Sequence, residues 1–201
     1  MDAGVGEFPW QVEWNFVSPF HSSSLPQVAL LLGSELTSQG CGGALVSDRY
    51  VVTAAHCTDG SQPADLKVAI GFTSLAVNNE LISFVLDVSA IKQHPDYDSV
   101  TIENDISVLE LQRPVDLTAH PNIKPIFFPA SGATYNGFSA TVSGWGTLEF
   151  DGPSTAYLQQ VQVEVFADGD CGGVLDPSMT SDMICAGVKA GKSGYTPSGG
   201  V

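Results

Sequence analysis

Short runs of β-forming residues recur along this chain, and turn residues separate them. The run at residues 66–70 shows the pattern, because Leu66, Val68 and Ile70 alternate with Lys67 and Ala69. A period near two is typical of a strand with one buried face, and no segment has the pattern of a long helix. Strands at such close spacing predict an all-β barrel or sandwich. The predicted strands lie at residues 50–53, 66–72, 81–88, 105–111, 140–145, 157–165 and 183–188.

Residues 112–138 divide these strands into two groups. The segment contains Pro114, Pro121, Pro125 and Pro129, and proline removes the N–H that a central strand must donate. We therefore predict a linker at 112–138 between an N-terminal β unit at 1–111 and a C-terminal β unit at 139–201.

Composition excludes several classes of partner. The chain has 201 residues, of which 43% are hydrophobic, so it can bury a core. Its net charge of -15, with only 7 Lys and Arg residues, argues against nucleic acid and against an anionic membrane surface. No run of 18 apolar residues occurs, so no membrane span is predicted.

The four cysteines do not predict a metal site. None forms a Cys-x-x-Cys pair, and His21, His94 and His120 lie outside zinc-ligand spacing. Spacing alone permits three disulfide pairings. The cysteines are Cys41, Cys57, Cys171 and Cys185.

Two ionisable residues lie where strands are predicted to end or begin. His56 follows the apolar run of residues 51–55 and precedes Cys57, and Asp105 opens the run of residues 105–111. A histidine at a strand end can act as a general base, and an aspartate can accept its ring N–H and stabilise the imidazolium. The alternatives are a structural histidine and an aspartate that caps the start of a strand.

Four motifs together carry a family resemblance. They are residues 51–57 (Val-Val-Thr-Ala-Ala-His-Cys), residues 104–106 (Asn-Asp-Ile), residues 143–146 (Ser-Gly-Trp-Gly) and residues 183–187 (Met-Ile-Cys-Ala-Gly). They closely resemble the trypsin and chymotrypsin family of serine endopeptidases, over nearly the whole chain. The resemblance implies an all-β, two-barrel fold, with His56 as the base and Asp105 as the residue that orients it. Ser107 stands where this family commonly has alanine.

The resemblance also selects disulfides and a compartment. It implies the pairs Cys41 with Cys57 and Cys171 with Cys185, which form in an oxidising, secretory compartment. Residues 1–4 do not read as a signal peptide, so we expect a secreted, extracellular protein whose N-terminus precedes this chain. The family's first strand matches either residues 7–12 or residues 25–32, and residues 15–24 have no family counterpart. The Gly-Trp-Gly turn around Trp145 resembles a turn that lies near the substrate cleft in the family. The alternative is that Trp145 serves aromatic packing over a glycine turn.

The resemblance departs from the family pattern near the C-terminus. The family continues with Gly-Asp-Ser-Gly-Gly-Pro, whereas residues 196–201 read Thr-Pro-Ser-Gly-Gly-Val. Ser198 is the candidate nucleophile if one deletion is allowed. Pro197 then replaces the aspartate that pairs with the freed N-terminal amine, and Thr196 replaces an oxyanion-hole glycine. Each missing oxyanion donor costs about 10²–10³ in rate.

Two functions follow from this resemblance. The first is a secreted serine endopeptidase that acts as a monomer on protein or peptide substrates, without cofactor or metal. In this reading the chain is C-terminally truncated, its second barrel is incomplete, and it is inactive in this form. The second is a non-catalytic serine protease homologue that acts as a binding or regulatory protein.

Overall fold

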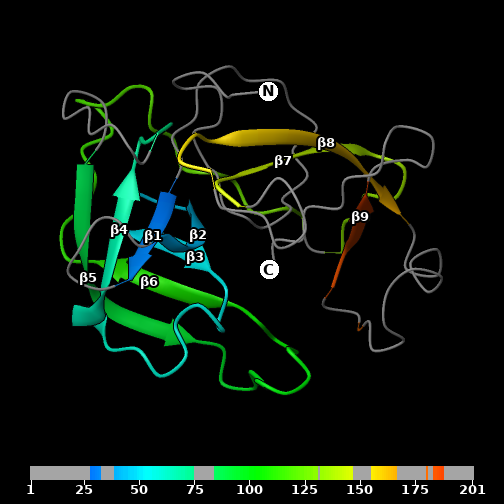
Figure 1. The fold of residues 1–201 in the computed structure, drawn as a ribbon, viewed down its shortest axis with the longest axis horizontal. Coiled ribbons are helices and arrows are strands. Elements are labelled where there is room, and N and C mark those ends of the chain that lie inside the picture. Colours follow the sequence, from blue (N-terminus) through cyan, green and yellow to red (C-terminus); the bar gives the residue numbers. More distant parts are fainter. Residues whose placement is uncertain are drawn as a thin grey trace.

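The computed structural model describes residues 28–32, 39–74, 84–130, 132–146, 155–166, 180 and 183–187. In this part of the chain every regular element is a strand except one short 3₁₀ turn, η1 (Pro63–Asp65) (Figure 1). The strands are β1 (Val28–Leu32), β2 (Gln39–Leu45), β3 (Tyr50–Thr53), β4 (Leu66–Ile70), β5 (Phe84–Gln93), β6 (Ser107–Leu111), β7 (Ser139–Gly144), β8 (Gln159–Phe166) and β9 (Cys185–Gly187). The predicted all-β fold class is confirmed.

The first six strands form a closed barrel in the order β1-β2-β3-β6-β5-β4, with antiparallel neighbours throughout. Strand β5 lets the barrel close, because its first half pairs with β4 and its second half with β6. The register shifts between Val88 and Ala90, and a bulge of this kind bends a strand and increases its twist.

Two strands depart most from what the sequence predicted. Strand β5 continues to Gln93, beyond the predicted end at residue 88, because Lys92 and Gln93 pair with Val108 and Ser107 of β6. Strand β2 was not predicted, since Gly40, Gly42 and Gly43 give it little strand propensity. Strand β1 lies within the predicted residues 25–32, whereas the alternative first strand at 7–12 and residues 15–24 lie outside the described residues.

The barrel interior is filled by the apolar residues of alternating positions. In β6, Ser107, Leu109 and Leu111 are buried while Val108 and Glu110 are half-buried, so burial alternates with a period of two. Each fully buried Leu, Ile or Val contributes about 1.5–3 kcal/mol relative to an exposed one. The largest buried side chains of this cluster are Leu45, Val51, Leu66, Val68, Ile70, Leu109, Leu111 and Ile123.

The segment after β6 has no regular strand, but its first part belongs to the barrel. Val115 and Ile123 are 4% and 1% exposed and lie in the barrel core. The Val115 N–H donates to the carbonyl of Asp48, and the Ile126 N–H donates to the carbonyl of Leu45. These contacts hold the first part of the segment against the barrel.

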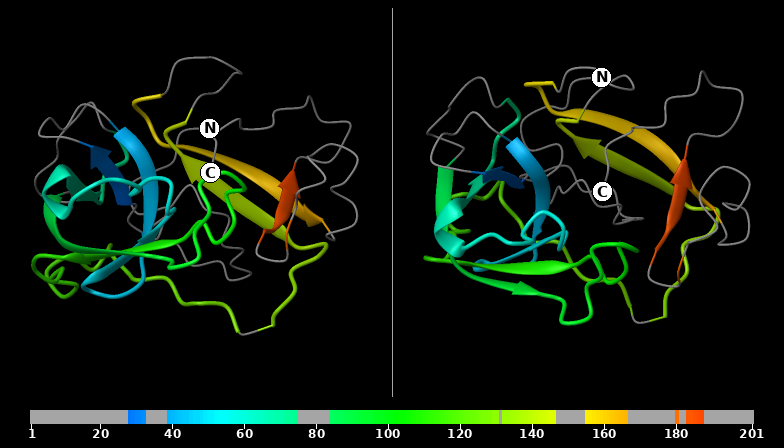
Figure 2. Two further views of the ribbon diagram at one scale, coloured as in Figure 1. Left: turned by 90° about the horizontal axis from the view of Figure 1, so that it is seen from below. Right: turned by 60° about the horizontal axis from the view of Figure 1, so that its bottom comes forward.

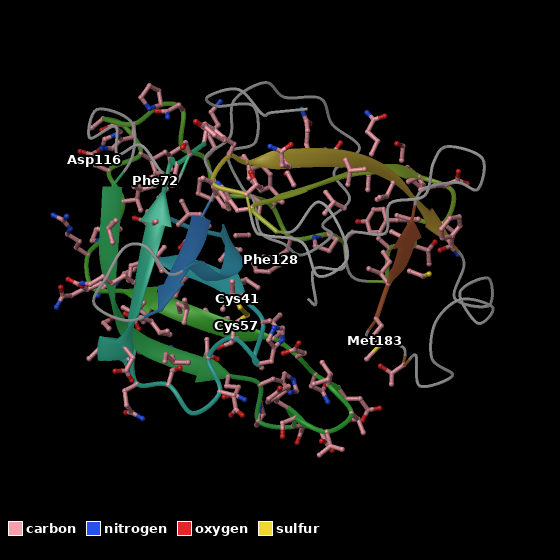
Figure 3. All side chains as sticks on the ribbon, viewed as in Figure 1. Cys41, Cys57, Phe72, Asp116, Phe128 and Met183 are labelled. Carbon is pink, nitrogen blue, oxygen red and sulfur yellow. A yellow bond between two sulfur atoms is a disulfide. The ribbon has the colours of Figure 1, made fainter. Side chains whose placement is uncertain are left out.

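After this segment, β7, β8 and β9 form a three-stranded antiparallel sheet that lies beside the barrel (Figure 2). Its end is attached to the barrel through Trp145 and Leu158, which are buried against Ala69. Phe72, labelled in Figure 3, packs against the same cluster. The indole of Trp145 therefore serves apolar packing between the two units.

The topology predicts that the three-stranded sheet opens more readily than the barrel. Among the described strands β7 has one neighbour, whereas each barrel strand has two, and less-paired regions exchange amide hydrogens faster. In native-state hydrogen exchange we expect amides of β7 to exchange at least about tenfold faster than those of β4. The amides of β6 provide the control and should match β4. Equal protection in β7 and β4 of a monomer would contradict the prediction.

Candidate active site

The pairing of β3 with β6 brings two distant segments together. Thr53, the last residue of β3, lies opposite Ser107, the first residue of β6. Because the strands are antiparallel, the residues just after β3 meet the residues just before β6. His56 and Asp105, which are 49 positions apart in the sequence, thus lie side by side at this end of the barrel.

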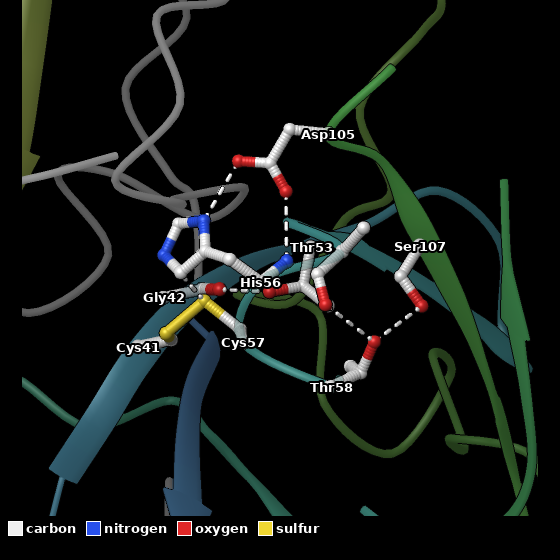
Figure 4. Close-up of a disulfide and its surroundings, with 9 residues drawn as sticks. Cys41, Gly42, Thr53, His56, Cys57, Thr58, Asp105 and Ser107 are labelled. Carbon is white, nitrogen blue, oxygen red and sulfur yellow. Dashed lines mark hydrogen bonds and ion pairs between the residues drawn. A yellow bond between two sulfur atoms is a disulfide. The ribbon is translucent and has the colours of Figure 1, made fainter. Parts of the chain in front are cut away.

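Asp105 contacts His56 through both of its carboxylate oxygens (Figure 4). Its Oδ2 lies 2.7 Å from Nδ1 of the His56 ring, and its Oδ1 accepts the backbone N–H of His56 at 2.7 Å. The Asp105 side chain is only 4% exposed, and these two hydrogen bonds compensate the lost hydration of its charge. With the Nδ1 proton donated to the carboxylate, Nε2 keeps its lone pair and can accept a proton.

The residue before Asp105 has an unusual backbone conformation. Asn104 has a φ of 54°, in the left-handed region that asparagine tolerates better than most residues. Its side-chain amide donates to the carbonyl of Asp96 at 3.1 Å. The Asn-Asp pair of the sequence motif therefore combines a turn residue with the carboxylate that the turn directs at His56.

The predicted disulfide Cys41–Cys57 is confirmed. It joins β2 to the residue that follows His56, and the Cys57 sulfur lies 3.4 Å from Nε2 of His56. In the described part of the chain, Cys41, His56 and Cys57 are the one group with metal-ligand proximity. The disulfide removes both sulfurs as thiolate ligands, so the group does not make a metal site.

The remaining predicted site residues are only partly described. Cys185 is not a free thiol, but its predicted partner Cys171 lies outside the described residues, and so does Ser198. His94, which was not predicted as a site residue, serves its loop, because its Nδ1 accepts the N–H of Asp96 at 3.2 Å.

Tyr97 is electrostatically linked to the site, which the sequence did not indicate. Burial raises the pKa of the Tyr97 hydroxyl, and the negative charges of Asp105, Asp59 and Asp98 raise this pKa further. The negative charges of these carboxylates disfavour the further negative charge that ionisation of the Tyr97 hydroxyl would create.

Comparison with known proteins agrees with this geometry. The family model described as Trypsin matches residues 2–200. The serine protease filzig of Drosophila melanogaster is 33% identical over 192 residues, which cover 93% of this chain and 10% of filzig. Trypsin-1 of Astacus astacus is 34% identical over 194 residues, or 94% of this chain and 74% of that protein. Serine proteinase stubble of Drosophila melanogaster is 28% identical, over 94% of this chain and 23% of stubble.

The chain therefore belongs to the trypsin family, a family of serine proteases that act on protein substrates. It spans only a small part of filzig and of stubble, so their whole-protein activities do not transfer to it directly. In the described part of the chain, no helix has the length and apolar character needed to cross a membrane.

Replacing Asp105 should be detectable at Tyr97. In Asp105→Asn, the largest charge contribution that raises the pKa of Tyr97 is removed, so this pKa should fall while staying above its ordinary value because burial persists. NMR titration of the assigned Tyr97 ring measures it. Asp59→Asn is the matched control, with a smaller decrease because its charge ranks lower. An unchanged pKa in Asp105→Asn would contradict the proximity of these groups.

Removing the Cys41–Cys57 disulfide should destabilise the barrel. The bridge spans 16 positions, and a loop of about this length contributes about 3 kcal/mol through the reduced entropy of the unfolded chain. Urea unfolding of the Cys41→Ala/Cys57→Ala variant should show this loss relative to the parent protein. A loss below about 1 kcal/mol would show that the bridge does not stabilise the barrel in this way.

Proposed function

We propose that this chain is a serine endopeptidase of the trypsin type, with His56 as general base and Asp105 as the residue that orients it. The observation that carries the proposal is the double contact of Asp105, at 2.7 Å to the ring and 2.7 Å to the backbone of His56. In catalysis His56 Nε2 takes a proton from the nucleophile, and Asp105 stabilises the imidazolium that forms. The substrate is a protein or a peptide, and no cofactor takes part.

The nucleophile is the part that departs from this mechanism. Ser198 is the candidate, with Pro197 and Thr196 before it. Proline has no N–H to donate, and a threonine in place of the glycine does not supply the family's oxyanion geometry. We therefore propose that a polypeptide of residues 1–201 is inactive. We also propose three parts for the chain: a barrel at 1–111, a linker at 112–138 whose Val115 and Ile123 pack into the barrel core, and a second β unit at 139–201.

We further propose that the protein is secreted and acts outside the cell as a monomer. Supporting this are the Cys41–Cys57 disulfide, which persists in oxidising compartments, and the trypsin family itself. The net charge of -15 supports the absence of nucleic-acid and membrane-surface partners.

The second candidate function is a non-catalytic homologue that binds a protein partner. The observation that favours it is Pro197 in place of the family's aspartate. In this case His56 and Asp105 are retained as part of the barrel structure without a substrate.

The test is hydrolysis of peptide amides with Arg, Phe or Ala at the cleaved position, together with labelling by a fluorophosphonate that reacts with activated serines. We expect neither from residues 1–201, since loss of the serine in subtilisin lowers kcat by about 10⁶. Turnover that His56→Ala abolishes would overturn the proposed inactivity.

A second experiment separates the two functions. The transcript is sequenced, and its full product is expressed and treated with the same fluorophosphonate. A product with a Gly-Asp-Ser-Gly-Gly-Pro segment should be labelled, and His56→Ala should abolish the labelling. A full product that lacks the segment and is not labelled would favour the binding homologue over the endopeptidase.

A further inference from the structure

Two buried hydroxyl groups connect the segments that carry His56 and Asp105. Thr58 follows His56 by two positions and Ser107 follows Asp105 by two positions, and their side-chain oxygens lie 3.0 Å apart (Figure 4). Thr58 is 1% exposed and Ser107 is 0% exposed. Hydroxyl groups this deeply buried need hydrogen-bond partners within the protein, and this contact supplies one to each of them.

Thr58 also closes the turn in which His56 lies. Its backbone N–H donates to the carbonyl of Ala55 at 2.9 Å, and its Oγ1 lies 3.1 Å from the same carbonyl. His56 and Cys57 are therefore the two central residues of a turn from Ala55 to Thr58. Each hydroxyl has one proton to donate, and the Ala55 carbonyl can only accept. Both contacts are therefore hydrogen bonds when Ser107 donates to Thr58 and Thr58 donates to the Ala55 carbonyl.

The turn is thus attached to the β6 segment at two points. On one side Asp105 accepts the His56 N–H, and on the other Ser107 contacts Thr58. Ser107 itself is fixed by its pairing with Thr53 of β3 and Gln93 of β5. Together with the Cys41–Cys57 bridge to β2, these two contacts fix the position of the imidazole relative to the carboxylate.

We propose that Thr58 and Ser107 are positioning residues, whose shared hydrogen bond holds the Ala55–Thr58 turn in register against β6 so that both Asp105–His56 hydrogen bonds form. The effect of this positioning on catalysis rests on the function proposed above. Both side chains are buried and act through His56. A displacement of about 1 Å in such a group costs about 10²-fold in rate in a competent enzyme.

The experiment uses NMR on the 201-residue chain with Ser107→Ala and Thr58→Val. Two signals report on the Asp105–His56 contacts: the exchange rate of the His56 backbone amide, and the deshielded proton on His56 Nδ1 at low temperature. Each variant should speed exchange of the His56 amide about five- to tenfold, the size expected for one lost hydrogen bond, and move the Nδ1 proton upfield. Thr58→Ser keeps the hydroxyl and should retain both signals.

Thr53→Val is the matched control. The Thr53 hydroxyl is equally buried, at 1% exposed, but it donates to the carbonyl of Gly42 at 2.7 Å and so joins β3 to β2. Its loss should affect the barrel without a specific change at His56, once exchange is normalised to the Leu109 amide. The double variant Ser107→Ala/Thr58→Val should resemble Thr58→Val alone, because both substitutions remove the same Thr58–Ser107 hydrogen bond.

Asp105→Asn separates failure of this inference from failure of the proposed function. If Asp105→Asn removes the deshielded proton and speeds exchange of the His56 amide while Ser107→Ala and Thr58→Val leave both signals unchanged, the positioning role is wrong and the His56–Asp105 pair stands. If Asp105→Asn also leaves both signals unchanged, the carboxylate does not bind His56 in solution, and both the positioning role and the proposed function lose their basis.

Discussion

The antiparallel register of β3 and β6 is the constraint on which this molecule depends. It places Val51 opposite Leu109 in the core and Thr53 opposite Ser107 at the barrel end. A slip of β6 by one residue would turn its buried face outward. The same slip would separate His56 from Asp105, so the apolar core and the candidate site are set by one pairing.

The candidate site is built from backbone as well as side-chain contacts. Asp105 binds the main chain of His56 in addition to its ring, and the Cys41–Cys57 bridge fixes the next residue. A nearly buried carboxylate is costly unless charge-assisted hydrogen bonds satisfy it. Because the histidine supplies both donors, the interaction that stabilises the aspartate also orients the base.

The two halves of the molecule differ in how they bury their strands. The barrel pairs each of its six strands on both sides, and Val115 and Ile123 of the following segment add to its core. The three-stranded sheet packs its own small cluster around Ala140, Val163 and Val165. It is joined to the barrel through Trp145 and Leu158. The glycine turn around Trp145 therefore has a structural role.

The sequence by itself determined the all-β class and most strand positions, because period-two patterns are local. Its short motifs, through their family resemblance, also indicated the Cys41–Cys57 pair and made His56 and Asp105 candidates. Only the tertiary structure decided that glycine-rich β2 is a strand, that β5 continues to Gln93, and that Thr58 meets Ser107. These features depend on partners far away in the chain, and a hydroxyl or a glycine carries no local signal of the partner that folding supplies.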